Sequence, residues 1–358
     1  MNKKGISSKK VAAAYIGTVV GAGFATGQEI LQFFTRFGIM GIMGLFVTTI
    51  MFIVFGYIIM DLGRQISARS HLDIIKATNS GIIVTILDSI ITVFLFGSFT
   101  AMIAGTGALF TQQFNIPSLY GNIFMAIITA LTVLTGINGV INSISFVVPF
   151  LLCAVLGISI FSISNYPLEF STSSAFINEN MLVSNWFISA ILYVSYNLII
   201  SVGILGPLGM EAKDMSAVKK GALLGGLGLG IGSIMIYLAL SGSISEISNL
   251  EVPMIHIAGK ISYTIQIIYA SVLIAEIYTT AVGSLYGFVS RITDIRKFSL
   301  KNIMIVLEIT IAALLASQFG FSNLVKYLYP IEGYGGIILI LSLMYTKFFH
   351  HNLRNKNM

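Results

Sequence analysis

Apolar segments of about twenty residues or more fill the 358-residue chain, and short polar stretches separate them. A hydrocarbon core about 30 Å thick needs roughly twenty apolar residues of helix to cross it. Hydropathy windows of that length predict ten membrane-spanning helices and leave no room for a separate soluble domain. We therefore expect residues 1–358 to form a single all-α integral membrane transport domain. The predicted spans are residues 10–36, 39–63, 82–113, 119–138, 142–164, 182–208, 217–241, 257–290, 302–319 and 328–349.

The two halves of the chain have the same pattern of spans. The third and eighth spans are the longest, and each follows a polar connection of similar length, at 64–81 and 242–256. Because five spans is an odd number, the second half must enter the membrane upside down relative to the first. This is the inverted-repeat plan of many secondary transporters. We predict a 5+5 inverted repeat, with units at about 10–164 and 182–349.

The first span, VAAAYIGTVVGAGFATGQEILQFFTRF, carries Gly17, Gly21, Gly23 and Gly27 at mid-depth. Each glycine costs a helix interior about 1 kcal/mol relative to alanine, so this cluster favours local unwinding. Unwound backbone inside a membrane is tolerated only where protein or a water-filled cavity satisfies its polar groups. The pattern predicts a broken first helix beside a binding site. Close helix packing through small residues is the alternative.

If the halves are repeats, the sixth span should be broken like the first. Polar residues at its mid-depth are costly unless they face protein or a cavity. Gly203, Gly206 and Pro207 follow them and weaken the helix further. We therefore predict that helices 1 and 6 are both broken at mid-membrane. The polar residues of the sixth span are Tyr193, Ser195, Tyr196 and Asn197.

Composition and charge agree with a membrane protein and predict its orientation. The chain is 56% hydrophobic and 9% charged, whereas soluble domains are about 25% charged. With the N-terminus inside, all basic residues except Arg36, Lys260 and Lys326 fall in inner segments, as the positive-inside rule requires. The net charge of +6 is then a topology signal and argues against a nucleic-acid partner. We expect a multi-pass protein of the cell inner (plasma) membrane with both termini in the cytoplasm.

The segment GTVVGAGFATGQEI, in a ten-span chain of this size, resembles the YkvI-type amino acid permeases. These belong to the amino acid–polyamine–organocation superfamily, which shares the LeuT-type fold, and the resemblance covers essentially the whole chain. It implies that an amino acid or related amine binds between spans 1, 3, 6 and 8. Its carboxylate would meet unpaired N–H groups where a half-helix begins after the first break. The substrate-binding residues implied are Gly21, Ala22, Gly23, Phe24, Tyr193, Ser195, Tyr196 and Asn197.

The resemblance also implies a cation site made of hard oxygen ligands. Sodium-coupled members of this fold combine carbonyl groups at the first break with two adjacent hydroxyl residues on the eighth span. The matching groups are the carbonyls of Gly17, Val20 and Glu276 and the hydroxyls of Thr279 and Thr280. Helical threonines also bond carbonyls of their own helix, and this is the alternative. The fifth span lacks the lysine of proton-coupled relatives, which favours sodium.

Two acidic residues within the spans are candidates for gating or for carrying a proton. Carboxylates at membrane depth are functional-site hypotheses by default. Glu276 lies one turn before Thr279, where it can take up a proton or face a cationic group of the substrate. It replaces the small residue usual in sodium-coupled relatives, so sodium and protons both stay open as coupling ion. Glu29 follows the first break and is a candidate for the outer gate.

The remaining chemistry of the chain argues against an enzyme. None of the histidines, at 71, 256, 350 and 351, lies at mid-depth, so a nucleophile has no apparent base. Cys153 is the single cysteine, and we expect no transition metal. We predict a secondary active transporter of a small amino acid or related amine that works by alternating access, with Na⁺ or H⁺ as its coupling ion and no other cofactor. A sensor of the same fold that binds an amino acid without moving it is the alternative. The expected partners are this small molecule and the lipid bilayer, whereas the oligomeric state is left open.

Overall fold

The structure, a computed structural model, describes residues 5–68, 70–79, 81–134, 137–170, 182–183, 185–293 and 299–349, with the backbone alone for 137–149. Within these ranges almost every residue belongs to a helix. An isolated β-bridge between Ile6 and Ala212 is the β-structure found in this described part of the chain. The all-α fold predicted from the hydropathy pattern is therefore confirmed.

The first predicted span is broken, as its glycines predict. It consists of α1 (Ser8–Val19), α2 (Ala22–Thr26) and α3 (Gln28–Phe33), followed by the 3₁₀ turn η1 (Thr35–Phe37). Between α1 and α2 the backbone is extended, with φ −70° and ψ 113° at Val20 and φ −129° at Gly21. Between α2 and α3, Gly27 has φ +80°, a left-handed conformation that glycine adopts without steric penalty.

The predicted break in the sixth span is wrong, because α9 (Trp186–Glu211) is continuous. Two of its central polar side chains are satisfied within the helix. Ser195 Oγ donates to the carbonyl of Ile191 at 2.7 Å, and Asn197 Nδ2 donates to the carbonyl of Tyr193 at 2.9 Å. Such bonds to the preceding turn satisfy buried polar groups without unwinding the backbone.

The other predicted spans also overlap with helices, although the eighth, 257–290, begins in α12 (Pro253–Ile261) and passes through the extended Ser262 into α13 (Tyr263–Ile292). Among the described residues, seven helical segments are long and apolar enough to cross a membrane by length and composition, and two shorter apolar helices accompany them. The ten-span count and the 5+5 repeat stay predictions. The long helices besides α9 are α4 (Ile39–Ile66), α6 (Ile82–Phe114), α7 (Ser118–Leu134), α8 (Ile137–Asn165), α10 (Met215–Ser241), α13 (Tyr263–Ile292), α14 (Leu300–Ala316) and α16 (Tyr329–Phe349).

Short helices connect the long ones. The helix α5 begins with a capping box, in which Ser70 and Asp73 satisfy each other's backbone N–H groups. A π-helical turn, η4, leads directly into α16. These elements are α5 (His71–Thr78), α11 (Ile244–Ile247), α12 (Pro253–Ile261), η3 (Ser317–Phe319), α15 (Phe321–Asn323) and η4 (Leu324–Leu328).

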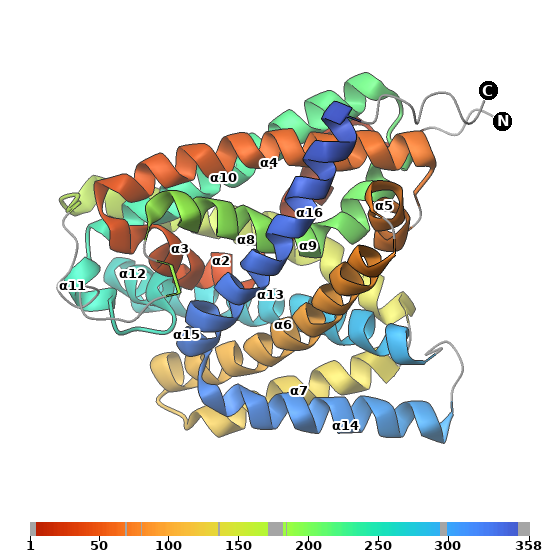
Figure 1. Ribbon diagram of the computed structural model, residues 1–358. Coiled ribbons are helices and arrows are strands. Elements are labelled where there is room, and N and C mark those ends of the chain that lie inside the picture. Colours follow the sequence, from red (N-terminus) through yellow and green to blue (C-terminus); the bar gives the residue numbers. More distant parts are fainter. Residues whose placement is uncertain are drawn as a thin grey trace.

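Helices that are distant in the sequence pack closely in the bundle. The helix α4 packs against α9 and α10, and α13 packs against α6 and α8. Figure 1 shows α7 and α14 side by side at the lower edge of the bundle, where they also make contact. A Cβ added to Gly63 on α4 would lie 2.6 Å from the Cα of Gly206 on α9. Glycine therefore allows these two backbones to approach each other.

One end of the bundle gathers basic residues from several helices. The segment before α1 reaches the end of α9 through the bridge between Ile6 and Ala212. Arg64, in the last turn of α4, donates to the carbonyl of Ala212 at 2.6 Å. Lys347, near the end of α16, pairs with Asp61 of α4 at 2.8 Å. This arrangement agrees with the predicted inner side, although the orientation itself stays a prediction.

Candidate substrate and cation site

A cavity of about 230 Å³ lies beside the break of the first helix. Its wall comes from the three pieces of the first span and from α6, α9, α13 and α16. Apolar side chains form much of the surface, and polar side chains are interspersed among them. The lining includes Val19, Phe94, Leu95, Ser98, Met102, Ile200, Ile204, Ser284 and Tyr329 in addition to the residues described next.

Most residues that the sequence places in the site lie on this one cavity. They come from segments far apart in the sequence, the first span, α9 and α13, and the fold brings these segments together. Their roles as ligands stay predictions. From the first span they are Gly17, Val20, Gly21, Ala22, Gly23 and Glu29; from α9, Tyr196 and Asn197; and from α13, Glu276, Thr279 and Thr280.

Phe24, Tyr193 and Ser195 do not line the cavity. The ring of Phe24 is directed toward α10, where a Cβ added to Gly232 would lie 3.0 Å from it. Tyr193 meets Phe33 edge-on, with ring centroids 5.5 Å apart. Since α9 is continuous, neighbouring residues on it face different sides, and of its four predicted site residues Tyr196 and Asn197 line the cavity.

The Glu29 side chain lies against the backbone of the first break. A Cβ added to Gly23 would lie 2.6 Å from both Cγ and Cδ of Glu29. The carboxylate also faces the hydroxyl groups of Tyr193 and Tyr196. Glu29 Oε2 and the Tyr196 hydroxyl are both buried, and neither makes a hydrogen bond of normal geometry although the two side chains lie close together. Glu29 is therefore part of the cavity wall, next to a glycine that the resemblance assigns to the substrate.

The helix α13 brings the predicted cation ligands to the same break. A Cβ added to Gly21 would lie 3.8 Å from Thr280 Oγ1, so the two segments are in contact range. Thr279 Oγ1 donates to the carbonyl of Glu276 at 2.9 Å, which is the helix-internal bond of the alternative interpretation. The side chain of Glu276 is 2% exposed, and its Oε2 has no hydrogen-bond partner.

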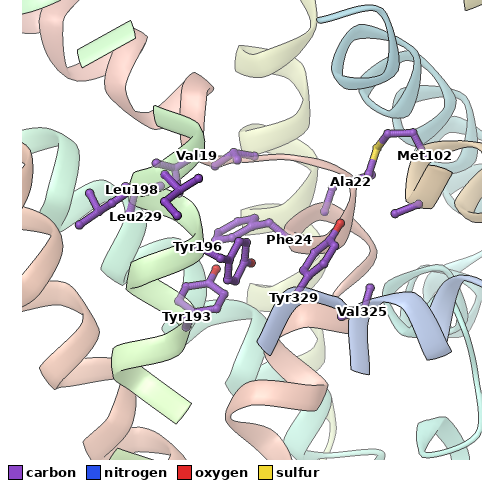
Figure 2. Packing of buried hydrophobic residues seen from close by; sticks show 14 of the residues in the cluster. Val19, Ala22, Phe24, Met102, Tyr193, Tyr196, Leu198, Leu229, Val325 and Tyr329 are labelled. Carbon is purple, nitrogen blue, oxygen red and sulfur yellow. The ribbon is translucent and has the colours of Figure 1, made fainter. Parts of the chain in front are cut away.

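Aromatic rings close one side of the cavity. Phe94 of α6 stacks on Tyr196 at a centroid distance of 6.3 Å, and Tyr329 of α16 contacts Tyr196 at 5.0 Å. Figure 2 shows Tyr196 and Tyr329 beside the link between Val19 and Ala22. The resemblance names the third span as part of the site, which is a signal for Phe94. Nothing in the sequence marks Tyr329, because an aromatic residue in a membrane helix is ordinary.

Comparison with known proteins gives two curated relatives, both from Bacillus subtilis (strain 168). The uncharacterized membrane protein YkvI is 29% identical over 344 residues, covering 95% of this chain and 96% of YkvI. The uncharacterized protein YyaD is 29% identical over 331 residues, covering 92% of this chain and 94% of YyaD. No protein-family model matches the chain.

Solved structures share the fold at low sequence identity. MhsT in complex with L-phenylalanine has a TM-score of 0.62 at 17% identity, covering 92% of this chain and 87% of MhsT. Mhp1, a nucleobase-cation-symport-1 family transporter with bromovinylhydantoin bound, has a TM-score of 0.59 at 11% identity, covering 96% and 79%. A Na⁺-coupled sialic acid symporter has 0.57 at 11% identity, covering 96% and 80%. The chain is thus a multi-pass relative of the YkvI-type membrane proteins and has the LeuT-type fold.

Proposed function

We propose that the protein is a secondary active transporter that moves a small amino acid or related amine, coupled to a cation. The cavity at the broken first helix carries this proposal. Broken helices near the midplane form the substrate and ion sites of many secondary transporters, because unwound backbone supplies polar groups there. Proteins of the same fold support it, since they include a nucleobase-cation-symport-1 family transporter and a Na⁺-coupled sialic acid symporter.

The substrate would occupy the space between the first break and α9. The backbone of Gly21, Ala22 and Gly23 borders this space on one side, and Tyr196 and Asn197 border it on the other. The N–H groups that open a helix lack intrahelical partners, so they can donate to a bound molecule. Phe24, Tyr193 and Ser195, which do not line the cavity, would act on the substrate only through packing.

The coupling cation would lie where α13 meets the break. Carbonyls of Gly17 and Val20 and hydroxyls of Thr279 and Thr280 offer oxygen atoms there, the ligands that hard cations prefer. The bond from Thr279 to the carbonyl of Glu276 leaves a lone pair on each oxygen, so it does not exclude a cation. Sodium suits this set of ligands, whereas a proton would instead reside on Glu276 or Glu29.

Transport would then require only a shift between two conformations. A bound cation would hold the extended residues Val20 and Gly21 in place and thereby order the neighbouring substrate site. The two sets of helices would rock around the occupied site, and no covalent intermediate is needed. The ligands drive this exchange only as far as their affinities for the two conformations differ.

A thermal-shift screen of amino acids and amines, with and without sodium, tests the proposal on the purified full-length protein. Hits are then tested for uptake into proteoliposomes under an inward sodium or proton gradient, with protein-free liposomes as the control. Saturable, gradient-dependent uptake of a hit supports a transporter. A hit that stabilises the protein but never crosses the membrane supports the sensor instead. If no compound of either class binds, the proposal is wrong.

A further inference from the structure

The cavity at the helix break is acidic. Glu29 and Glu276 lie on its wall, and no lysine, arginine or histidine occurs among the described residues that line it. A ligand carboxylate would find no basic side chain to pair with there, and its charge would oppose the ionisation of both glutamates. An ammonium group would instead favour the ionised form of a neighbouring glutamate and pair with it.

Both carboxylates are buried, so the absence of a basic side chain on the cavity wall has an energetic consequence. Glu29 is 5% exposed and Glu276 is 2% exposed, and the Oε2 atom of each has no hydrogen-bond partner. An ionised carboxylate that is buried without a partner is strongly unfavourable. A positively charged ligand in the cavity would supply the missing partner, so the site is better satisfied when a cation occupies it.

Glu29 also lies beside the backbone segment that the resemblance assigns to the substrate carboxylate. The resemblance puts that carboxylate on the backbone from Gly21 to Phe24. In the structure, the Cγ and Cδ atoms of Glu29 lie so close to Gly23 that a Cβ there would stand 2.6 Å from each. The protein thus brings its own carboxylate to this backbone, and a second one from a ligand would be placed against it.

The rest of the wall suits the apolar body of an amine. Phe94 and Met102 of α6 and Ile200 of α9 supply apolar surface. Phe94 and Tyr196 stack with their ring planes 16° apart, and aromatic faces attract an organic cation. The hydroxyl of Tyr196 faces the Glu29 carboxylate, and its lone pairs add a hydrogen-bond acceptor there.

We propose that the molecule bound in the cavity is an organic amine without a carboxylate, and that its ammonium group pairs with Glu29. Glu276, on the opposite helix beside Thr279 and Thr280, then faces the coupling cation. This inference rests on the proposed transport function and narrows its substrate class from amino acids and amines to amines alone.

Matched ligand pairs on the wild-type protein test the inference. The pairs are phenylalanine with phenethylamine, leucine with 3-methylbutylamine, and alanine with ethylamine, so that each pair differs only by the carboxylate. We expect at least one amine to bind about tenfold or more tightly than its amino acid, the factor typical of one charge-assisted contact. Amino acids that bind as tightly as their amines, or more tightly, would overturn the inference.

These outcomes separate the inference from the proposed function. Uptake of amino acids without binding of amines overturns the inference and leaves the transporter intact. Binding of amines without uptake of any compound supports the inference on ligand class and removes transport. Since the ligand pairs need only wild-type protein, neither conclusion depends on whether a variant folds.

A charge-removing variant tests the role of Glu29 itself. Glu29→Gln keeps the shape of the side chain, and we expect it to weaken phenethylamine binding about tenfold or more without weakening phenylalanine binding. Glu308→Gln on α14 is the matched control, because Glu308 is exposed and lies outside the cavity wall. Unfolding temperature without ligand checks that both variants fold. Equal phenethylamine affinity in folded Glu29→Gln and wild type would rule out this pairing.

Discussion

Replacing Gly23 by alanine places a methyl group in the space that the Glu29 side chain occupies. A Cβ at this position would lie 2.6 Å from Cγ and Cδ of Glu29, far inside van der Waals contact. These atoms belong to a flexible side chain, so Glu29 can rotate away while the backbone of α2 keeps its course. We therefore expect Gly23→Ala to displace the carboxylate and leave the fold intact.

The sizes of the two effects follow from this geometry. Alanine gains about 1 kcal/mol over glycine in a helix, and overpacking costs about 1–3 kcal/mol. The free energy of unfolding should therefore fall by about 0–2 kcal/mol. Loss of one contact to a charged group weakens ligand binding by about 1.5–3 kcal/mol, or about 10- to 150-fold in Kd. Binding should thus change far more than stability.

The assay is a thermal-shift titration with phenethylamine on purified protein, followed by competition for uptake in proteoliposomes. Gly157→Ala on α8 is the matched control, because a Cβ at Gly157 meets no atom within 4 Å. We expect the control to bind like the wild type. Wild-type affinity in Gly23→Ala would refute the idea that the position of Glu29 over this glycine matters for the ligand. Loss of folding would show that the Glu29 side chain cannot move aside.

Three further variants test other parts of the molecule. Thr280→Ala should weaken the sodium dependence of ligand-induced stabilisation, and an unchanged dependence would contradict the cation site. Burial raises the pKa of Glu251, which lies outside the spans, so the fold disfavours its ionised form. The stability of the fold then decreases as the pH rises above the pKa of Glu251 in the unfolded chain. Glu251→Gln should therefore raise Tm at pH 7 but not near pH 4. A Tm difference that is the same at both pH values would contradict this reasoning. Gly63→Ala should lower the free energy of unfolding by about 1–3 kcal/mol, because its Cβ would press on the backbone of Gly206; an unchanged denaturation midpoint would contradict this packing.

Local properties of the chain account for the features that the sequence predicts correctly. Apolar segments cross a bilayer whatever their neighbours are, so the helices follow from hydropathy alone. The break in the first span follows from glycine, which weakens a helix and, at Gly27, adopts a left-handed conformation. The contact between this break and the threonine pair on α13 is predicted from the resemblance to a known fold, in which the corresponding segments meet.

Two predictions that rest on repeat symmetry and on residue polarity are wrong for the sixth span. The repeat predicts a broken sixth helix, yet α9 is continuous, and Ser195 and Asn197 bond carbonyls of their own helix. Polarity also places Tyr193 in the site, whereas its ring packs against Phe33. Residue types alone do not decide between these arrangements, because a polar side chain at membrane depth can either bond to its own helix or face a cavity.

By itself, the sequence determines the helical membrane architecture and the broken first helix, because hydropathy and backbone preference act locally. The resemblance to a known family adds most of the residues around the break. Only the tertiary structure decides what fills the space beside that break. Glu29 lies eight residues after the extended Gly21, and its side chain reaches back to Gly23 across the left-handed turn at Gly27. Tyr196 and Tyr329 line the same cavity beside it. The carboxylate of Glu29 is buried because α9, α13 and α16 pack around the first span. Its preference for a positively charged ligand therefore follows from tertiary packing and not from local sequence.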